Sequence, residues 1–266
     1  MPKMGNNLAQ YLRTESMPSM WCPGCGHGNI LRGILSAFQQ IDLDLDQTVV
    51  VGGIGCSGRT PFYTDTHSMH TTHGRALAFG TGIKLANPEL SVIAVMGDGD
   101  TAAIGGNHFI HACRRNIDMT AVIFNNNIYG MTGGQTAPTT PESMKSTTAR
   151  DGNPDRPFDI VELAKAAGAT FIARTTTFDF VDLPSLIARA IEHKGFSVVE
   201  VLTQCPTYFG RLNKIGDAVE MLDYERDLTV PMMQITREEL LEKMPIGVFR
   251  EEIKPSYTEQ YKQSID

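Results

Sequence analysis

The sequence predicts an α/β protein in which helices cover both faces of a parallel sheet. Three short apolar runs, 48–54, 91–96 and 119–124, are rich in β-branched residues and are expected to be strands buried on both faces. Helical patterns lie between them, and strand alternating with helix is typical of a parallel sheet. Composition agrees, since 41% of the 266 residues are apolar and 20% are charged.

The elements follow in order along the chain. Apolar residues recur every three or four positions after a CPGCGHGN turn, which predicts a helix over about 27–39. Residues 129–158 show no period and are long for a plain connection, so we expect a functional loop. The remaining expected elements are helices near 74–86, 101–115, 159–167, 180–194, 217–227 and 236–243, and strands near 170–174 and 196–202.

The pattern weakens after Cys205, and a polar tail contains Pro245 and Pro255. We therefore expect one domain over 1–205 and a C-terminal extension over 206–266 that packs on the domain or on a partner subunit.

Charge and cysteine content exclude several function classes. The formal net charge is −7, and no basic run exceeds Arg114-Arg115, which argues against nucleic-acid binding. No apolar stretch approaches the roughly 20 residues that cross a bilayer, and the N-terminus lacks an apolar signal core. We expect a cytoplasmic protein that binds no membrane. Five cysteines without a secretory signal argue against a disulfide framework.

A GDGD run follows the expected strand 91–96, where parallel sheets present their ligand sites. Asn126 lies 28 residues after Asp98, at the end of the next strand, so the two side chains should converge. Glycines let the backbone approach a phosphate, and the following helix start offers free N–H groups. Carboxylate, amide and carbonyl oxygens suit Mg²⁺. Taken alone, GDGD also fits a hairpin or a calcium-binding turn.

Together, GDGD and the later NNNIYG element resemble the thiamine diphosphate signature. By that resemblance, Asp98, the Asn126 side chain and the Ile128 carbonyl hold Mg²⁺. Adjacent glycines after Tyr129 expose N–H groups and are expected to close over the diphosphate. The expected cofactor contacts are Gly97, Asp98, Gly99, Asp100, Asn126, Ile128, Tyr129, Thr132 and Gly133.

Four cysteines lie in loops that contain Gly or Pro: Cys22 and Cys25 in a CPGC turn, Cys56 after the first strand, and Cys205 after the last. Four cysteines are the usual ligands of a [4Fe–4S] cluster. Zinc normally needs a second CxxC pair, and a thioredoxin-like pair needs neither Cys56 nor Cys205. Spacing leaves cluster, zinc and plain buried thiols open. Cys113, inside an expected helix, is interpreted as structural.

Six motifs follow one another along the chain: WCPGCGHG, GGIGCSGR, HTTHGRALAFGTGIKLANP, GDGD, NNNIYGMTGGQ and the late CP. They occur in the order found in the β subunits of 2-oxoacid:ferredoxin oxidoreductases, and the chain resembles that family over roughly 15–255, most of all its 2-oxoglutarate type. The resemblance implies that the four loop cysteines ligate a [4Fe–4S] cluster close to thiamine diphosphate.

The implied activity is oxidative decarboxylation of a 2-oxoacid, with 2-oxoglutarate giving succinyl-CoA and CO₂, or the reverse reaction. Coenzyme A would receive the acyl group and ferredoxin the electrons. An α subunit would supply the pyrimidine-binding half and the catalytic glutamate. Pyruvate or branched-chain specificity is an alternative, as are a non-oxidative thiamine diphosphate decarboxylase or synthase subunit and a non-enzymatic metal-binding module.

Two further residues are candidates for contact with the reacting groups. His73 lies in a Gly- and Thr-rich stretch that the resemblance places near the reacting end of the cofactor; a packed or exposed histidine is the alternative. Arg59 follows Cys56 by three residues, and its planar guanidinium suits a substrate carboxylate. A solvated surface arginine is the competing interpretation.

Overall fold

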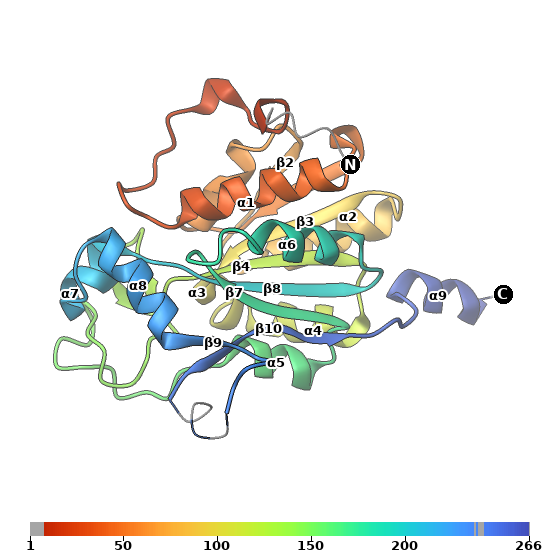
Figure 1. The fold of residues 1–266 in the computed structure, drawn as a ribbon. Helices are drawn as coiled ribbons and strands as arrows, with labels where there is room; N and C mark the ends of the chain where they lie inside the picture. Colours follow the sequence, from red (N-terminus) through yellow and green to blue (C-terminus); the bar gives the residue numbers. More distant parts are fainter. Residues whose placement is uncertain (1–7, 237, 239–241, 266) are drawn as a thin grey trace.

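One sheet of eight strands forms the centre of the computed structural model, which describes residues 8–236, 238 and 242–265 (Figure 1). The strand order is β2-β1-β3-β4-β8-β7-β10-β9. All neighbours run parallel from β2 to β7, and β10 runs antiparallel to β7. The strands of this sheet are β1 (Thr48–Gly52), β2 (His67–His70), β3 (Ser91–Gly97), β4 (Met119–Asn125), β7 (Phe171–Thr176), β8 (Phe196–Leu202), β9 (Thr229–Pro231) and β10 (Met244–Glu251).

Helices cover both faces of the sheet, as the sequence predicts (Figure 1). Alternate residues of a strand point to opposite faces, so the central strands β1, β3, β4, β7 and β8 each contribute to two cores. The helices are α1 (His27–Gln40), α2 (Ala76–Ala86), α3 (Asp98–Ala102), α4 (Gly106–Arg115), α5 (Ile160–Ala167), α6 (Leu183–Glu192), α7 (Arg211–Asn213), α8 (Ala218–Leu228) and α9 (Tyr257–Ile265).

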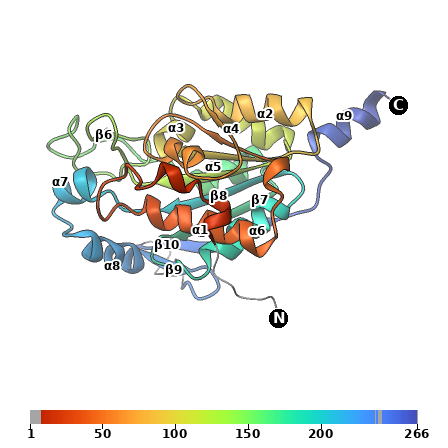
Figure 2. The same cartoon turned by 90° about the horizontal axis from the view of Figure 1, so that it is seen from above.

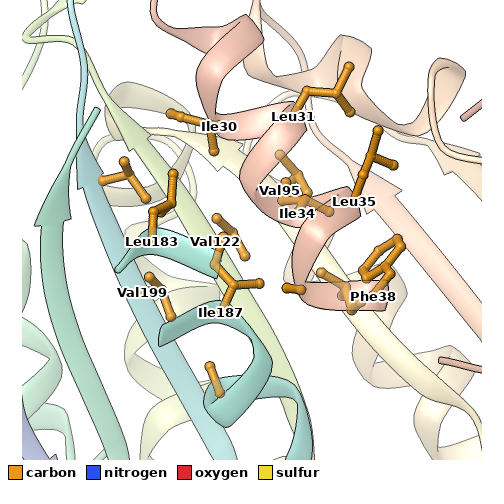
Figure 3. Packing of buried hydrophobic residues seen from close by; sticks show 14 of the residues in the cluster. Ile30, Leu31, Ile34, Leu35, Phe38, Val95, Val122, Leu183, Ile187 and Val199 are labelled. Carbon is orange, nitrogen blue, oxygen red and sulfur yellow. The ribbon is translucent and has the colours of Figure 1, made fainter. Parts of the chain in front are cut away.

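The core on one face lies between α1, α6 and the sheet (Figure 3). The apolar side of α1 packs against Leu183 and Ile187 of α6 and against strand residues such as Val122. The core on the other face joins the strands to α2, α4 and α5, and it includes Phe109 and Cys113 of α4. Cys113 is fully buried there, in agreement with a structural role.

The expected helix over 101–115 is wrong as one element. Two helices, α3 and α4, replace it, and the break falls at 103–105. A Cβ on Gly105 would overlap the carbonyl oxygen of Asp100, and the Cα of Gly74 lies beside the same position. The break therefore lets the 73–74 segment approach the start of α3.

The loop over 129–158 contains a short hairpin of β5 (Ile128–Tyr129) and β6 (Gln135–Thr136) and is otherwise irregular. The helix expected near 236–243 falls largely on residues 237 and 239–241, which lie outside the described residues. The expected polar tail instead contributes β10 to the sheet, with Val248 opposite Ala173 of β7.

The C-terminal helix α9 projects away from the rest of the molecule in both views (Figures 1 and 2). Its first residue is attached to the domain, because the Tyr257 N–H donates to the Asn116 carbonyl at 3.1 Å. Within the described part of the chain, each helix is too short or too polar to span a bilayer.

Candidate active site at the ends of four neighbouring strands

The predicted site residues follow the carboxyl ends of strands that are neighbours in the sheet, in the order β1-β3-β4-β8. Cys56 lies beyond β1, Asp98 directly follows β3, Asn126 directly follows β4, and Cys205 lies beyond β8. Parallel strands present all four ends on one edge, which is where α/β proteins bind ligands.

A cavity of about 150 Å³ opens at this edge. Most of the predicted cofactor contacts line it, and so does one of the four loop cysteines. The predicted site residues that line the cavity are Cys56, His73, Gly97, Asp98, Gly99, Asp100, Asn126, Ile128, Tyr129 and Thr132. Its lining does not include Cys22, Cys25, Arg59, Gly133 or Cys205.

Asp98 is the most perturbed carboxyl at the cavity. Its side chain is 3% exposed, and burial raises the pKa of Asp98 from its ordinary value of 3.8 to about 7. The Thr139 hydroxyl donates to Asp98 Oδ2 at 2.5 Å, which favours the charged form and lowers the pKa of Asp98 in part. The carboxylate is thus held in position but is short of compensating positive charge.

Asn126 and Ile128 lie on a tight turn at the end of β4. Asn126 is 7% exposed, and its Oδ1 accepts the Ile128 N–H at 3.3 Å. Between them Asn127 adopts a left-handed conformation with φ of 59°, which asparagine tolerates better than most residues. The turn places an amide oxygen and a short strand beside Asp98.

Gly99 has a steric reason to lack a side chain. A Cβ at this position would overlap the ring of Tyr129, whose hydroxyl donates to the Gly99 carbonyl at 3.3 Å. In the following loop, Thr132 Oγ1 donates to Gln135 Oε1 at 2.7 Å, and the Gly133 N–H donates to the Gly130 carbonyl at 3.2 Å. The Gly133 N–H is therefore already engaged within the loop.

His73 and Asp100 form a pair at the cavity wall. His73 Nδ1 lies 2.7 Å from Asp100 Oδ1, which also accepts the Gly74 N–H at 2.6 Å. His73 Nδ1 is buried and makes no hydrogen bond of good geometry in the described part of the chain, so the pair is a close polar contact. Burial raises the pKa of Asp100, and His73 opposes that shift. A Cβ on Gly53 would overlap the Asp100 carboxyl group, which explains that glycine.

Arg59 lies on a short 3₁₀ helix, Ser57–Phe62, outside the cavity lining. Its guanidinium carbon is 5.7 Å from the centroid of the Phe62 ring. Its Nε is buried and has no hydrogen-bond partner among the described residues.

The four loop cysteines lie close enough to influence one another. Burial, with smaller contributions from Cys205, Cys56 and Cys22, raises the pKa of Cys25 to about 12. Burial likewise raises the pKa of Cys56 to about 11, with contributions from Cys205 and Cys22. In the part of the chain that the structure describes, no three His, Cys, Asp or Glu side chains are grouped to hold a single metal ion. The four thiols therefore lie near one another, but they do not converge as the ligands of a single ion would.

Two hydrogen bonds join the loops that carry these cysteines. Trp21 Nε1 donates to the Cys56 carbonyl at 2.7 Å, and the Gly26 N–H donates to the Gln204 carbonyl at 3.4 Å. The CPGC turn is therefore attached to the loop after β1 and to the loop after β8.

Thr139 and His27 are among the residues of the site that sequence reasoning missed. Thr139 contacts Asp98 across 41 positions of the chain, and only the aperiodic loop that contains it indicated a function. His27 lines the cavity and is 1% exposed, with its Nδ1 3.2 Å from Cys25 Sγ and its ring 4.9 Å from that of Phe124. Burial lowers the pKa of His27 to about 3, so the ring is neutral.

Comparison with known proteins agrees with this geometry. Residues 53–201 match the family model of the thiamine pyrophosphate enzyme C-terminal TPP-binding domain. The chain is 51% identical to the 2-oxoglutarate synthase subunit KorB of Archaeoglobus fulgidus, over 97% of this chain and 94% of the relative. It is 38% identical to a 2-oxoacid:ferredoxin oxidoreductase subunit beta of Sulfolobus sp, over 91% and 85%.

A solved structure extends the likeness to the fold. The 2-oxoglutarate:ferredoxin oxidoreductase from Magnetococcus marinus, with 2-oxoglutarate, coenzyme A and succinyl-CoA bound, matches with a TM-score of 0.88 at 34% identity. The match covers 99% of this chain and 91% of that one. Sequence, fold and site together place this chain in the family of 2-oxoacid:ferredoxin oxidoreductase β subunits.

Proposed function

We propose that this chain carries thiamine diphosphate, Mg²⁺ and a [4Fe–4S] cluster in an enzyme that converts 2-oxoglutarate and coenzyme A into succinyl-CoA and CO₂, with ferredoxin as electron acceptor. The observation that carries the proposal is that Asp98 and Asn126 line one cavity together with Cys56, at neighbouring strand ends. The relatives named for 2-oxoglutarate, and the ligands of the solved neighbour, support this substrate.

The Asp98 carboxylate, the Asn126 amide oxygen and the Ile128 carbonyl would hold Mg²⁺. These residues fit the ion, because Mg²⁺ takes oxygen ligands and commonly uses few from the protein. Within the described residues, neither Lys nor Arg lines the cavity, so a bound cation would supply the charge that the buried Asp98 lacks.

Gly97, Gly99, Tyr129 and Thr132 would surround the diphosphate, with Gly99 leaving room that a side chain would fill. When bound, thiamine diphosphate supplies an electron sink for decarboxylation. His73 would act on a proton near the reacting atoms. Its Nδ1 faces Asp100, which leaves Nε2 as the nitrogen available to a ligand.

Cys22, Cys25, Cys56 and Cys205 would hold the cluster. Burial raises the pKa of Cys25, Cys56 and Cys205, and iron would compensate the thiolate charge that burial disfavours at these three positions. Four loop cysteines are the usual ligand set of such a cluster, whereas a zinc site normally has a second CxxC pair, which this sequence lacks. When bound, the cluster accepts electrons one at a time.

The rest of the active site would come from an α subunit. Among the described residues that line the cavity there is no glutamate, and thiamine enzymes use one to activate the cofactor. The partner would thus supply the pyrimidine-binding half and that glutamate. Arg59 is proposed to pair with a substrate carboxylate, because its buried Nε has no partner in the described part of the chain.

The proposal is tested on the complex purified anaerobically with its partner. We expect reduction of ferredoxin that requires both 2-oxoglutarate and coenzyme A, bound thiamine diphosphate, and four iron atoms for each β chain. Faster turnover with pyruvate or branched 2-oxoacids would overturn the substrate assignment. Cofactor-dependent CO₂ release without iron or electron transfer would instead favour a non-oxidative decarboxylase.

A further inference from the structure

A chain of polar side chains, buried except at its outer end, runs across the three neighbouring strands β4, β8 and β7. Arg174 of β7 and Glu200 of β8 are opposite each other in the strand register, and they are 2% and 1% exposed. Arg174 Nε donates to Glu200 Oε2 at 2.7 Å, and Asn125 Nδ2 donates to Glu200 Oε1 at 2.7 Å. At the outer end, Arg174 Nη2 donates to Asp159 Oδ1 at 2.5 Å. The chain runs from the start of α5 to the last residue of β4.

Glutamate is the side chain that this arrangement requires at position 200. Its two carboxylate oxygens each accept from a different donor, one from Arg174 and one from Asn125. An amide side chain has one acceptor oxygen and would leave one donor facing an NH₂ group. A buried ion pair is expensive to desolvate and is weak support for stability by itself. The position of the Glu200–Arg174 pair therefore indicates a role in fixing the Asn125 side chain.

Asn125 transmits this anchoring to the turn that carries the proposed metal ligands. Its Nδ2 is held by Glu200, while its Oδ1 accepts the Asn127 N–H at 3.2 Å. Asn127 is the left-handed residue between Asn126 and Ile128. The Asn125 side chain is thus the link between a rigid buried charge and the backbone of that turn.

We propose that Glu200, held by Arg174, is a positioning residue for the divalent cation site, acting through Asn125 on the turn that presents Asn126 and Ile128. The inference rests on the proposed function, because it presumes that these residues hold the cation. It predicts that a residue outside the cavity lining controls metal affinity.

The test is Glu200→Gln in the complete complex, with Mn²⁺ as the probe in the presence of thiamine diphosphate. Free Mn²⁺ is measured by electron paramagnetic resonance, and unfolding by thermal scan. We expect the Mn²⁺ dissociation constant to rise about tenfold, as is common for residues that orient metal ligands. Glu251→Gln is the matched control: it breaks an exposed pair with Arg189 and should leave the constant unchanged.

A second variant, Asn125→Ala, keeps the Glu200–Arg174 pair and removes only the link to the turn. It should weaken Mn²⁺ binding to a similar extent. If Glu200→Gln fails to fold, this variant alone tests the positioning role of Glu200. Normal Mn²⁺ affinity in Asn125→Ala, with or without a lower unfolding temperature, would overturn the inference. Asp98→Ala separates the two proposals, because Mn²⁺ affinity that survives that change would overturn the metal site itself.

Discussion

Replacing Asp98 with asparagine should stabilise the cofactor-free protein while abolishing cofactor binding. Burial raises the pKa of Asp98 from 3.8 to about 7, so the folded protein holds this proton more tightly than the unfolded chain does. Below pH 3.8 the carboxyl is neutral in both states. Between pH 3.8 and 7 the unfolded chain releases the proton first, so stability falls as pH rises, and above pH 7 the loss is constant.

The size of the effect follows from the pKa difference of 3.2, since each unit corresponds to about 1.36 kcal/mol. The carboxylate thus destabilises the cofactor-free fold by about 4 kcal/mol at pH 8 and by about 3 kcal/mol at pH 6. Asparagine carries no charge, and the Thr139 hydroxyl can rotate to accept from its NH₂ group. The variant should escape the penalty.

The assay is a thermal scan of the complex stripped of metal and thiamine diphosphate, at several pH values. At pH 8 the unfolding midpoint of Asp98→Asn should exceed that of the unchanged protein by on the order of 10 °C. The difference should shrink toward pH 4. Asp42→Asn makes the same chemical change at an exposed position with φ of 47° and should show no such difference.

The same variant should bind neither Mn²⁺ nor thiamine diphosphate, and Asp98→Ala should lose activity for the same reason. A variant that is less stable than the unchanged protein at pH 8, or a difference that does not vary with pH, would refute the electrostatic reasoning. Full thiamine diphosphate occupancy would refute the metal assignment.

Four further predictions concern the cysteines, the cavity, the partner subunit and Arg59. Cys205→Ala should lower the iron content and Cys113→Ala should not, and the opposite order in iron analysis would contradict the assignment. Gly99→Ala should displace the Tyr129 ring and weaken thiamine diphosphate binding at least tenfold by fluorescence titration, whereas an unchanged affinity would show that the ring moves freely. The chain reconstituted without its partner should show no 2-oxoacid-dependent dye reduction, and turnover by the lone chain would reject the proposed division of the active site. Arg59→Ala in the complex should raise the Michaelis constant for 2-oxoglutarate, and an unchanged constant would reject the role proposed for Arg59.

The sequence was most informative where periodicity and burial coincide. The strands β1, β3 and β4 and the helix α1 were predictable because apolar side chains fill both faces of a strand or one face of a helix. Asp98 and Asn126 were predictable because a polar residue directly after a buried strand has to face a ligand or solvent.

Other features depend on contacts that have no local signal. The strand β2 reads His-Ser-Met-His and is largely exposed, so its sequence has no apolar run, and it is defined by its parallel pairing with β1. The strand β10 contains Pro245 and Gly247 and was missed because both residues normally weaken a strand. The contact of Thr139 with Asp98 and the anchoring of Asn125 by Glu200 arise from the packing of segments far apart in the chain.

The position of β10 also sets the order in which the sheet can be completed during synthesis. Residues 247–251 of β10 pair with Phe171–Arg174, so the β7 edge waits for some 75 further residues, from 176 to 251, to be made. At roughly 5–20 residues per second, translation of that stretch takes about 4–15 s. Once β8 has been made and has paired with β7, the other edge of β7 stays open until β10 is made, and an open edge is the kind that templates aggregation. Ribosome pausing within 177–243 should therefore reduce the soluble yield, even though none of the proposed ligands for Mg²⁺ or the cluster except Cys205 lies there.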